Sequence, residues 1–214
     1  MSSAHNASRP ALKPRSAAVF SPDLMADRVV LVTGGGSGLG LSMAAGLGAV
    51  GAKLILCGRS ADKLAAAAEG LRSHGVQVQA IPCDVRDPQQ VDAMVRRGVE
   101  LFGRIDGLIN NAAGNFLCAA EDLSAGGFDA VVKTVLYGTV YCTQAVGRHL
   151  IERKAAGSML SIVTSYAWTG SAFVLPSACA KAGVLAMTRS LAVERGCYGN
   201  RLNAIAPGPL PTEG

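Results

Sequence analysis

The chain has 214 residues, of which 50% are apolar and 16% charged, with 26 glycines and a formal net charge of +5. This composition fits one α/β domain, and the modest, dispersed positive charge favours small anionic ligands over nucleic acid. Its six cysteines form no CxxC motif and no cluster with histidine, which argues against a metal site, and no apolar run reaches the roughly 18 residues of a membrane span.

The first part of the chain differs in composition from the rest. Residues 1–19 contain basic residues but no acidic one, as mitochondrial transit peptides do. Pro10 and Pro14 would interrupt the amphipathic helix that such a peptide needs. We therefore expect a disordered arm over residues 1–24, a domain over residues 25–214, and a cytoplasmic rather than a mitochondrial location.

From Arg28 onward, apolar runs alternate with helix-forming stretches. The runs are continuous rather than alternating, which is typical of strands buried on both faces. Strands are predicted at 28–33, 52–57, 76–81, 105–110, 158–164 and 201–206, and helices at 38–50, 61–73, 88–102, 127–153 and 177–197. This order predicts a Rossmann-type α/β fold, a doubly wound parallel sheet of six strands.

The segment TGGGSGLG (33–40) lies between the first strand and the first helix. Glycines there allow a tight turn, close approach of the backbone to a pyrophosphate, and packing of helix on strand. The segment predicts a dinucleotide site, although the spacing is GxxxGxG and glycines can also serve only to make a turn. The cofactor-binding residues expected here are Gly34, Ser37, Gly38, Leu39 and Gly40.

The second strand ends in LCGRS, with no acidic residue to bind the ribose hydroxyls of NAD. Arg59 supplies a cation at that place, which favours the 2′-phosphate of NADP(H). The alternative is a solvated surface arginine without a role in cofactor choice.

With CDVRD (83–87), NNAAG (110–114) and APGP (206–209) in the same order, the chain resembles the short-chain dehydrogenase/reductase family over residues 28–209. The resemblance implies that Asp84 and Val85 contact the adenine and that the turn containing Asn111 packs beside the cofactor. It also implies that the segment containing Pro207 passes the nicotinamide. The NNAAG segment is also read as a turn that stabilises the sheet.

The catalytic positions differ from the family's ordinary form, in which a tyrosine precedes the lysine by four residues and a serine precedes that tyrosine by thirteen. Those places hold Ser177 and Thr164, whereas Tyr166 is expected at the end of the fifth strand. This arrangement, with NNAAGNF (110–116) and PSACAK, resembles the mitochondrial-type 2,4-dienoyl-CoA reductases. The resemblance implies the catalytic set Tyr166, Asn115, Ser177 and Lys181, with Lys181 also holding the nicotinamide ribose.

These residues can stabilise an enolate by donating hydrogen bonds to its oxygen. Negative charge that develops on a thioester oxygen is stabilised by two neutral donors, implied here to be Tyr166 and Asn115. We therefore expect NADPH-dependent reduction of 2,4-dienoyl-CoA thioesters in unsaturated fatty acid β-oxidation, with an acyl-CoA as substrate. A tyrosine that only packs under a loop is the alternative for Tyr166.

Two departures from the family pattern remain. Tyr137 stands in VLYGT where relatives usually carry an asparagine, which speaks against a proton relay there. The chain ends at Gly214, whereas the family continues with a lid, a helix and a seventh strand that build much of the homo-oligomer interface. The alternatives are therefore a short-chain reductase of another carbonyl or enoyl substrate, or an inactive truncated nucleotide-binding paralogue.

Overall fold

The computed structural model describes residues 19–208. The expected arm lies outside the described residues over positions 1–18. Residues 22–27 form turns against the domain, where the Met25 backbone N–H donates to the Val50 carbonyl at 2.8 Å.

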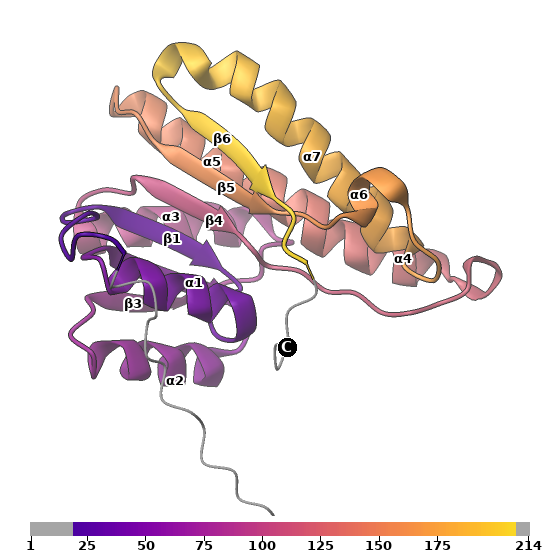
Figure 1. Ribbon diagram of the computed structural model, residues 1–214, viewed down its shortest axis with the longest axis horizontal. Helices are drawn as coiled ribbons and strands as arrows, with labels where there is room; N and C mark the ends of the chain where they lie inside the picture. Colours follow the sequence, from indigo (N-terminus) through magenta and orange to yellow (C-terminus); the bar gives the residue numbers. More distant parts are fainter. Residues whose placement is uncertain (1–18, 209–214) are drawn as a thin grey trace, which may run out of the picture.

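Six parallel strands form one sheet, in the order β3-β2-β1-β4-β5-β6 (Figure 1). Their bounds are β1 (Val29–Thr33), β2 (Lys53–Gly58), β3 (Val78–Pro82), β4 (Gly107–Asn110), β5 (Ser158–Ile162) and β6 (Arg201–Ile205). The order reverses between β1 and β4, so the doubly wound fold predicted from the sequence is confirmed. The open crevice of such a sheet lies at the carboxyl ends of the strands on either side of this reversal.

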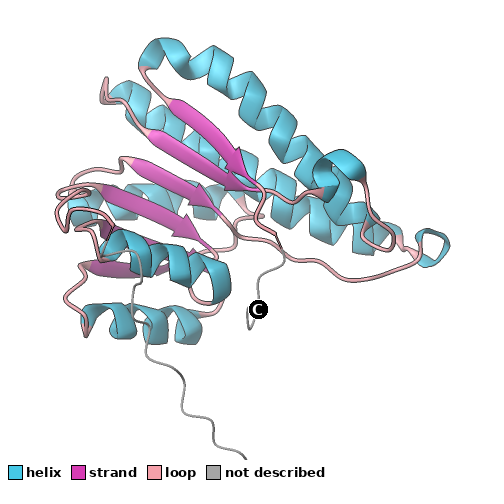
Figure 2. Ribbon diagram, in the orientation of Figure 1, coloured by secondary structure: helices cyan, strands magenta, loops and turns pink. Residues whose placement is uncertain are grey.

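Helices cover the sheet on both faces (Figure 2). Helices α1 (Gly38–Gly48) and α2 (Ala61–Arg72) pack on one face, and α3 (Pro88–Phe102), α5 (Gly138–Glu152) and α7 (Leu175–Arg195) on the other. The remaining elements are η2 (Ala120–Asp122), α4 (Ala125–Val132), η3 (Lys133–Tyr137), α6 (Tyr166–Thr169) and η4 (Gly196–Tyr198). Leu31, Leu54 and Ile55 on the central strands are fully buried, as continuous apolar runs require. Within residues 19–208, no helix is both long and apolar enough to cross a membrane.

Local signals fix where the helices near the crevice begin. The Ser60 side chain accepts from the Lys63 backbone N–H and caps α2, and Asp87 caps α3 ahead of Pro88. Each such cap contributes about 1 kcal/mol to stability. Because both helices follow the carboxyl ends of strands, their capped N-termini lie at the same edge of the sheet as the glycine turn.

Two sequence predictions need correction. Tyr166 was expected to end the fifth strand, but β5 stops at Ile162 and Tyr166 is the first residue of α6. The neighbouring strand pairs only as far as Ile205, so the chain turns instead, with the Ala167 N–H donating to the Thr164 carbonyl.

The predicted helix 127–153 is divided into α4, the π-helical turn η3 and α5. Gly138, the first residue of α5, packs directly on the loop after β3. A Cβ atom added there would lie 2.6 Å from a methyl carbon of Val85. π-helical turns are frequent at functional sites, and this one faces the crevice through Thr134.

Candidate active site

The glycine turn after β1 is packed so tightly that two of its glycines leave no room for a side chain. Gly34 has a φ of +65°, and a Cβ atom added to Gly40 would lie 2.2 Å from the Gly34 carbonyl oxygen. Neither position accepts another residue without rearrangement. The turn leads directly into the N-terminus of α1, which carries the partial positive charge and free N–H groups that bind phosphate oxygens.

Thr33 and Asn111 join β1 to β4 across the point where the strand order reverses. The buried Thr33 hydroxyl oxygen accepts from the backbone N–H groups of Asn111 and Ala112, each at 3.0 Å. The Asn111 side chain donates to the carbonyl oxygens of Thr33 and Gly34. The glycine turn is therefore held from the β4 side, and the NNAAG segment does stabilise the sheet as the sequence indicated.

A cleft of about 650 Å³ runs along the carboxyl ends of β1, β2 and β3. Its lining includes eight of the residues predicted to bind the cofactor, namely Gly34, Ser37, Gly38, Leu39, Arg59, Asp84, Val85 and Asn111. Gly40 supports the turn from behind, whereas Lys181 and Pro207 lie outside this part of the site. A glycine cradle, a helix N-terminus and nearby cations fit the phosphates of a nicotinamide dinucleotide. In the described part of the chain, no group of three metal-binding side chains accompanies them.

The end of β2 presents two cations to the cleft. Arg59 and Lys63 both line it, together with Ser60 between them. Lys63 was missed in the sequence analysis, although its position four residues after Arg59 in the first turn of α2 places it on the same side. A phosphate group at this point would meet both cations and the N-terminus of α2.

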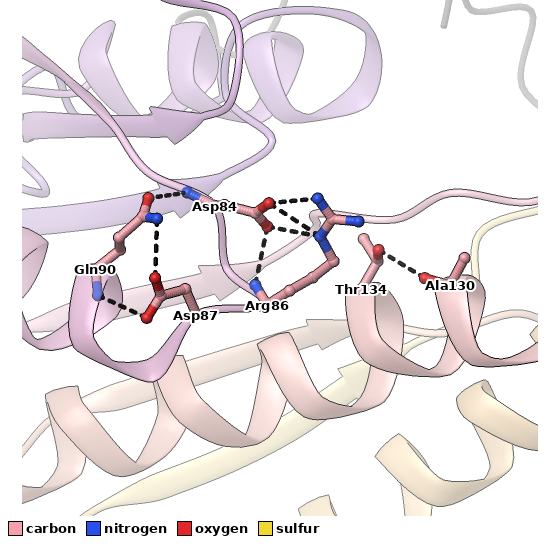
Figure 3. Close-up of polar contacts among 6 residues, drawn as sticks. All are labelled: Asp84, Arg86, Asp87, Gln90, Ala130 and Thr134. Atoms are coloured by element: carbon pink, nitrogen blue, oxygen red, sulfur yellow. Dashed lines mark hydrogen bonds and ion pairs between the residues drawn. The ribbon is translucent and has the colours of Figure 1, made fainter. Parts of the chain in front are cut away.

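At the end of β3, Arg86 holds the Asp84 carboxylate from one side (Figure 3). The Arg86 Nε donates to Oδ1 at 2.9 Å and to Oδ2 at 3.0 Å, Nη2 donates to Oδ2, and the Arg86 backbone N–H donates to Oδ1. The hydrogen bonds from the Arg86 side chain lower the pKa of Asp84, so the carboxylate is charged at neutral pH. Arg86 was not among the predicted site residues.

Tyr166 and Ser177 meet where α6 packs on α7. The Tyr166 hydroxyl lies 3.0 Å from the Ser177 hydroxyl oxygen, and either atom can be the donor. Ser177 is buried and Tyr166 is half-buried. The structure therefore places the phenol beside the helix position at which the ordinary family pattern carries it.

Lys181 lies one turn after Ser177 and is 6% exposed. Its Nζ donates to the Ile162 carbonyl at the end of β5. Burial lowers the pKa of Lys181 from 10.5 to about 8. At neutral pH the ammonium therefore stays charged, and two of its three N–H groups remain for a ligand.

Among the described residues, three other positions that the sequence analysis discussed make no hydrogen bond to Tyr166, Ser177 or Lys181. Asn115 lies exposed in the loop after β4, and its side chain makes no hydrogen bond within residues 19–208. Thr164 has a buried hydroxyl oxygen that finds no partner in the described part of the chain. Tyr137 is 45% exposed and stacks at an angle on Tyr141, with ring centres 6.2 Å apart.

Residues 28–214 match the family model described as short chain dehydrogenase. The chain is 44% identical over 191 residues to the probable 2,4-dienoyl-CoA reductase [(2E)-enoyl-CoA-producing] of Bacillus subtilis, which covers 89% of this chain and 75% of that protein. It is 41% identical over 198 residues to the peroxisomal 2,4-dienoyl-CoA reductase [(3E)-enoyl-CoA-producing] of Danio rerio, with 92% of this chain and 66% of that protein covered.

The fold also matches solved structures. A crystal structure of a short chain dehydrogenase from Bacillus anthracis superposes with a TM-score of 0.84 and 48% sequence identity, over 86% of this chain and 77% of that one. The matches therefore cover between 66% and 77% of the length of these three proteins.

Proposed function

The chain belongs to the short-chain dehydrogenase family, and from that premise we propose that it binds NADPH in the cleft and reduces 2,4-dienoyl-CoA thioesters beside Tyr166 and Ser177. The observation that carries the proposal is the 3.0 Å contact between these two hydroxyl groups, with serine at the helix position and tyrosine on α6. The similarity to 2,4-dienoyl-CoA reductases over most of the chain supports the same reading.

When bound, the reduced nicotinamide supplies the hydride that adds at C5 of the dienoyl chain. The electrons of the conjugated system then move toward the thioester oxygen and form a dienolate. Tyr166 donates a hydrogen bond to that oxygen, and Ser177 donates to the Tyr166 oxygen in turn. A chain of two hydroxyl donors polarised in one direction stabilises developing negative charge more than the phenol would alone.

Lys181 acts through its charge and its position. Its ammonium is fixed to the Ile162 carbonyl, one helical turn from Ser177, and it binds the nicotinamide ribose with its remaining N–H groups. Its positive charge, one helical turn after Ser177, also stabilises negative charge that develops in this part of the site. Asn115 reaches the thioester oxygen as a second donor only if the exposed loop that carries it closes over the substrate.

Reduction of a ketone requires a proton donor that reduction of a dienoyl thioester does not. An alkoxide needs a proton delivered to its oxygen, and the helix position that supplies it in the ordinary family form is Ser177, a much weaker acid than tyrosine. A dienolate needs no proton on oxygen, because water can protonate the carbon chain after hydride transfer. The displaced tyrosine is therefore compatible with the thioester reaction.

The cofactor preference rests on Arg59 and Lys63, which can pair with a 2′-phosphate, and on the absence of a carboxylate among the cleft residues at the end of β2. A cytoplasmic location and a homo-oligomeric state remain predictions.

The proposal is tested by comparing two substrates with the same protein. NADPH consumption is followed with a 2,4-dienoyl-CoA and with a β-ketoacyl-CoA of equal chain length. We expect turnover of the dienoyl-CoA and little or none of the ketone. Faster reduction of the ketone would replace this proposal with an ordinary carbonyl reductase, and NADPH binding without turnover of either would favour an inactive nucleotide-binding protein.

A further inference from the structure

The loop that carries Asn115 is anchored near both of its ends. It runs from the end of β4 to η2 and α4 (Figure 1). Near its start, the Ala112 backbone N–H donates to the buried Thr33 hydroxyl oxygen at 3.0 Å. Near its far end, the Cys118 backbone N–H donates to the Phe173 carbonyl oxygen at 2.9 Å. Asn115 lies midway between these two anchors.

The second anchor joins this loop to the segment that leads into α7. Phe173 is followed by the buried Val174 and then by α7, whose first turn carries Ser177. The ring of Phe116 adds a contact with α4, because a Cβ atom added to Gly127 would lie 3.0 Å from the end of that ring. The loop is therefore tied to the same helix that supplies part of the candidate active site.

Phe173 has an unusual backbone conformation. Its φ is +64°, in the left-handed region that bulky side chains rarely adopt. The side chain is 60% exposed, so packing of the ring does not account for the conformation. Strained backbone persists where the surrounding structure holds it, and it is frequent at functional sites. In this conformation the Phe173 carbonyl accepts the hydrogen bond from Cys118, which gives the strained residue a specific contact with the Asn115 loop.

From this geometry we propose that Phe173 is a positioning residue, whose left-handed backbone holds the loop so that Asn115 can donate to the thioester oxygen. The hydrogen bond at Cys118 shortens the segment that is free to move, and a shorter free segment has less conformational entropy. Asn115 therefore loses less freedom when it meets the substrate. This inference rests on the proposed function, because that function makes Asn115 a donor.

The test compares two substitutions that both remove the Phe173 ring. Phe173→Gly keeps the backbone conformation, since glycine adopts positive φ without strain, whereas Phe173→Val opposes it, because a β-branched residue is an outlier there. Any contact between the ring and the substrate is lost in both variants. The value of kcat for dienoyl-CoA should be roughly tenfold higher in Phe173→Gly than in Phe173→Val, because a misplaced donor stabilises the dienolate less. The two affinities for NADPH should be similar.

Two further measurements show how Phe173 acts. In an Asn115→Ala background the same two variants should have equal kcat values, since there is then no donor to position. Hydrogen exchange of the Cys118 amide needs no turnover, and it should be roughly tenfold slower in Phe173→Gly than in Phe173→Val. Ala172→Val is the matched control: it adds a valine at the neighbouring exposed position, where φ is not positive, and should leave kcat unchanged.

Three results would overturn the inference. Equal exchange of the Cys118 amide in the two variants would show that the conformation of Phe173 does not hold the loop. Equal kcat values despite different exchange would show that the hydrogen bond does not serve the reaction. A kcat difference that persists with Asn115→Ala would show that Phe173 acts through another group. If the wild-type protein reduces no dienoyl-CoA, the proposed function fails and the catalytic role of Phe173 fails with it, while the exchange data still report on the hydrogen bond.

Discussion

The hydroxyl groups of Tyr166 and Ser177 lie 3.0 Å apart, although one residue begins α6 and the other lies in the first turn of α7. The four-residue helix α6 is what brings the tyrosine back against α7 after β5 has ended. The tyrosine has therefore moved in sequence while its hydroxyl has stayed within one hydrogen bond of the helix position that it occupies in other family members.

Ser177→Ala should lower kcat for dienoyl-CoA by roughly tenfold and leave the affinity for NADPH nearly unchanged. The substitution removes the hydrogen bond to the Tyr166 oxygen but leaves the phenol as a donor to the substrate. Steady-state kinetics with a separate cofactor titration measures both effects. Ser171→Ala, at an exposed position of the loop before α7, is the matched control. An unchanged kcat in Ser177→Ala would show that this contact does not support the reaction.

Stability should depend on pH through Lys181. Its pKa in the folded protein is about 8, below the ordinary 10.5, because burial disfavours the ammonium. Below about pH 8 both folded and unfolded chains carry the proton, and folding bears the full cost of burying the charge. Between about pH 8 and 10.5 the unfolded chain binds more protons, so the free energy of unfolding should rise with pH.

Lys181→Met isolates this contribution from the other groups that titrate at high pH. The free energy of unfolding of the cofactor-free wild-type protein, measured in denaturant across that window, should increase relative to that of Lys181→Met. A constant difference between the two proteins would show that the pKa of Lys181 is not lowered in the folded state.

Arg59→Ala should weaken NADPH binding by roughly tenfold or more and leave NADH binding nearly unchanged, because only NADPH carries the 2′-phosphate. Lys63→Ala should have a smaller effect in the same direction, since an ammonium makes a less specific contact with phosphate. Calorimetric titration of both cofactors decides the matter, with Arg97→Ala as the control for a lost surface charge. Parallel losses for NADPH and NADH would remove Arg59 from the phosphate site.

Thr33→Val should lower the free energy of unfolding by roughly 1–3 kcal/mol. The change conserves shape but removes the oxygen that accepts the backbone N–H groups of Asn111 and Ala112, in a position that is 2% exposed. Denaturant unfolding measures the difference. Thr169→Val, on the exposed side of α6, should cost much less. Equal effects of the two substitutions would mean that the link between β1 and β4 contributes little.

The sheet and the glycine turn were predictable because their signals are local. Continuous apolar runs such as the one containing Leu54 and Ile55 mark strands buried on both faces, and the glycines after Thr33 mark a turn whose backbone cannot carry side chains. Both predictions were confirmed, as was the order of alternating strands and helices.

Features that depend on contacts between segments were not predictable in the same way. The end of β5 is set by how far β6 can pair with it, so the strand stops at Ile162 rather than at Thr164, and Tyr166 begins α6 instead of lying at the strand end. The hydrogen bonds from Arg86 to the Asp84 carboxylate depend on a turn of the backbone after β3. The identities of the two residues do not predict this turn. Asn115 remains a prediction, because its exposed loop shows no contact with the other proposed catalytic residues.

The most direct test of the account is the value of kcat for dienoyl-CoA reduction in Tyr166→Phe, compared with the wild-type protein under saturating NADPH. The phenylalanine ring keeps the packing of α6 on α7 but cannot donate to the thioester oxygen, so kcat should fall by roughly 10²–10³ while the affinity for NADPH stays nearly constant. A kcat close to the wild-type value would contradict the account, because Tyr166 would then be a packing residue and the site would stabilise the dienolate in some other way.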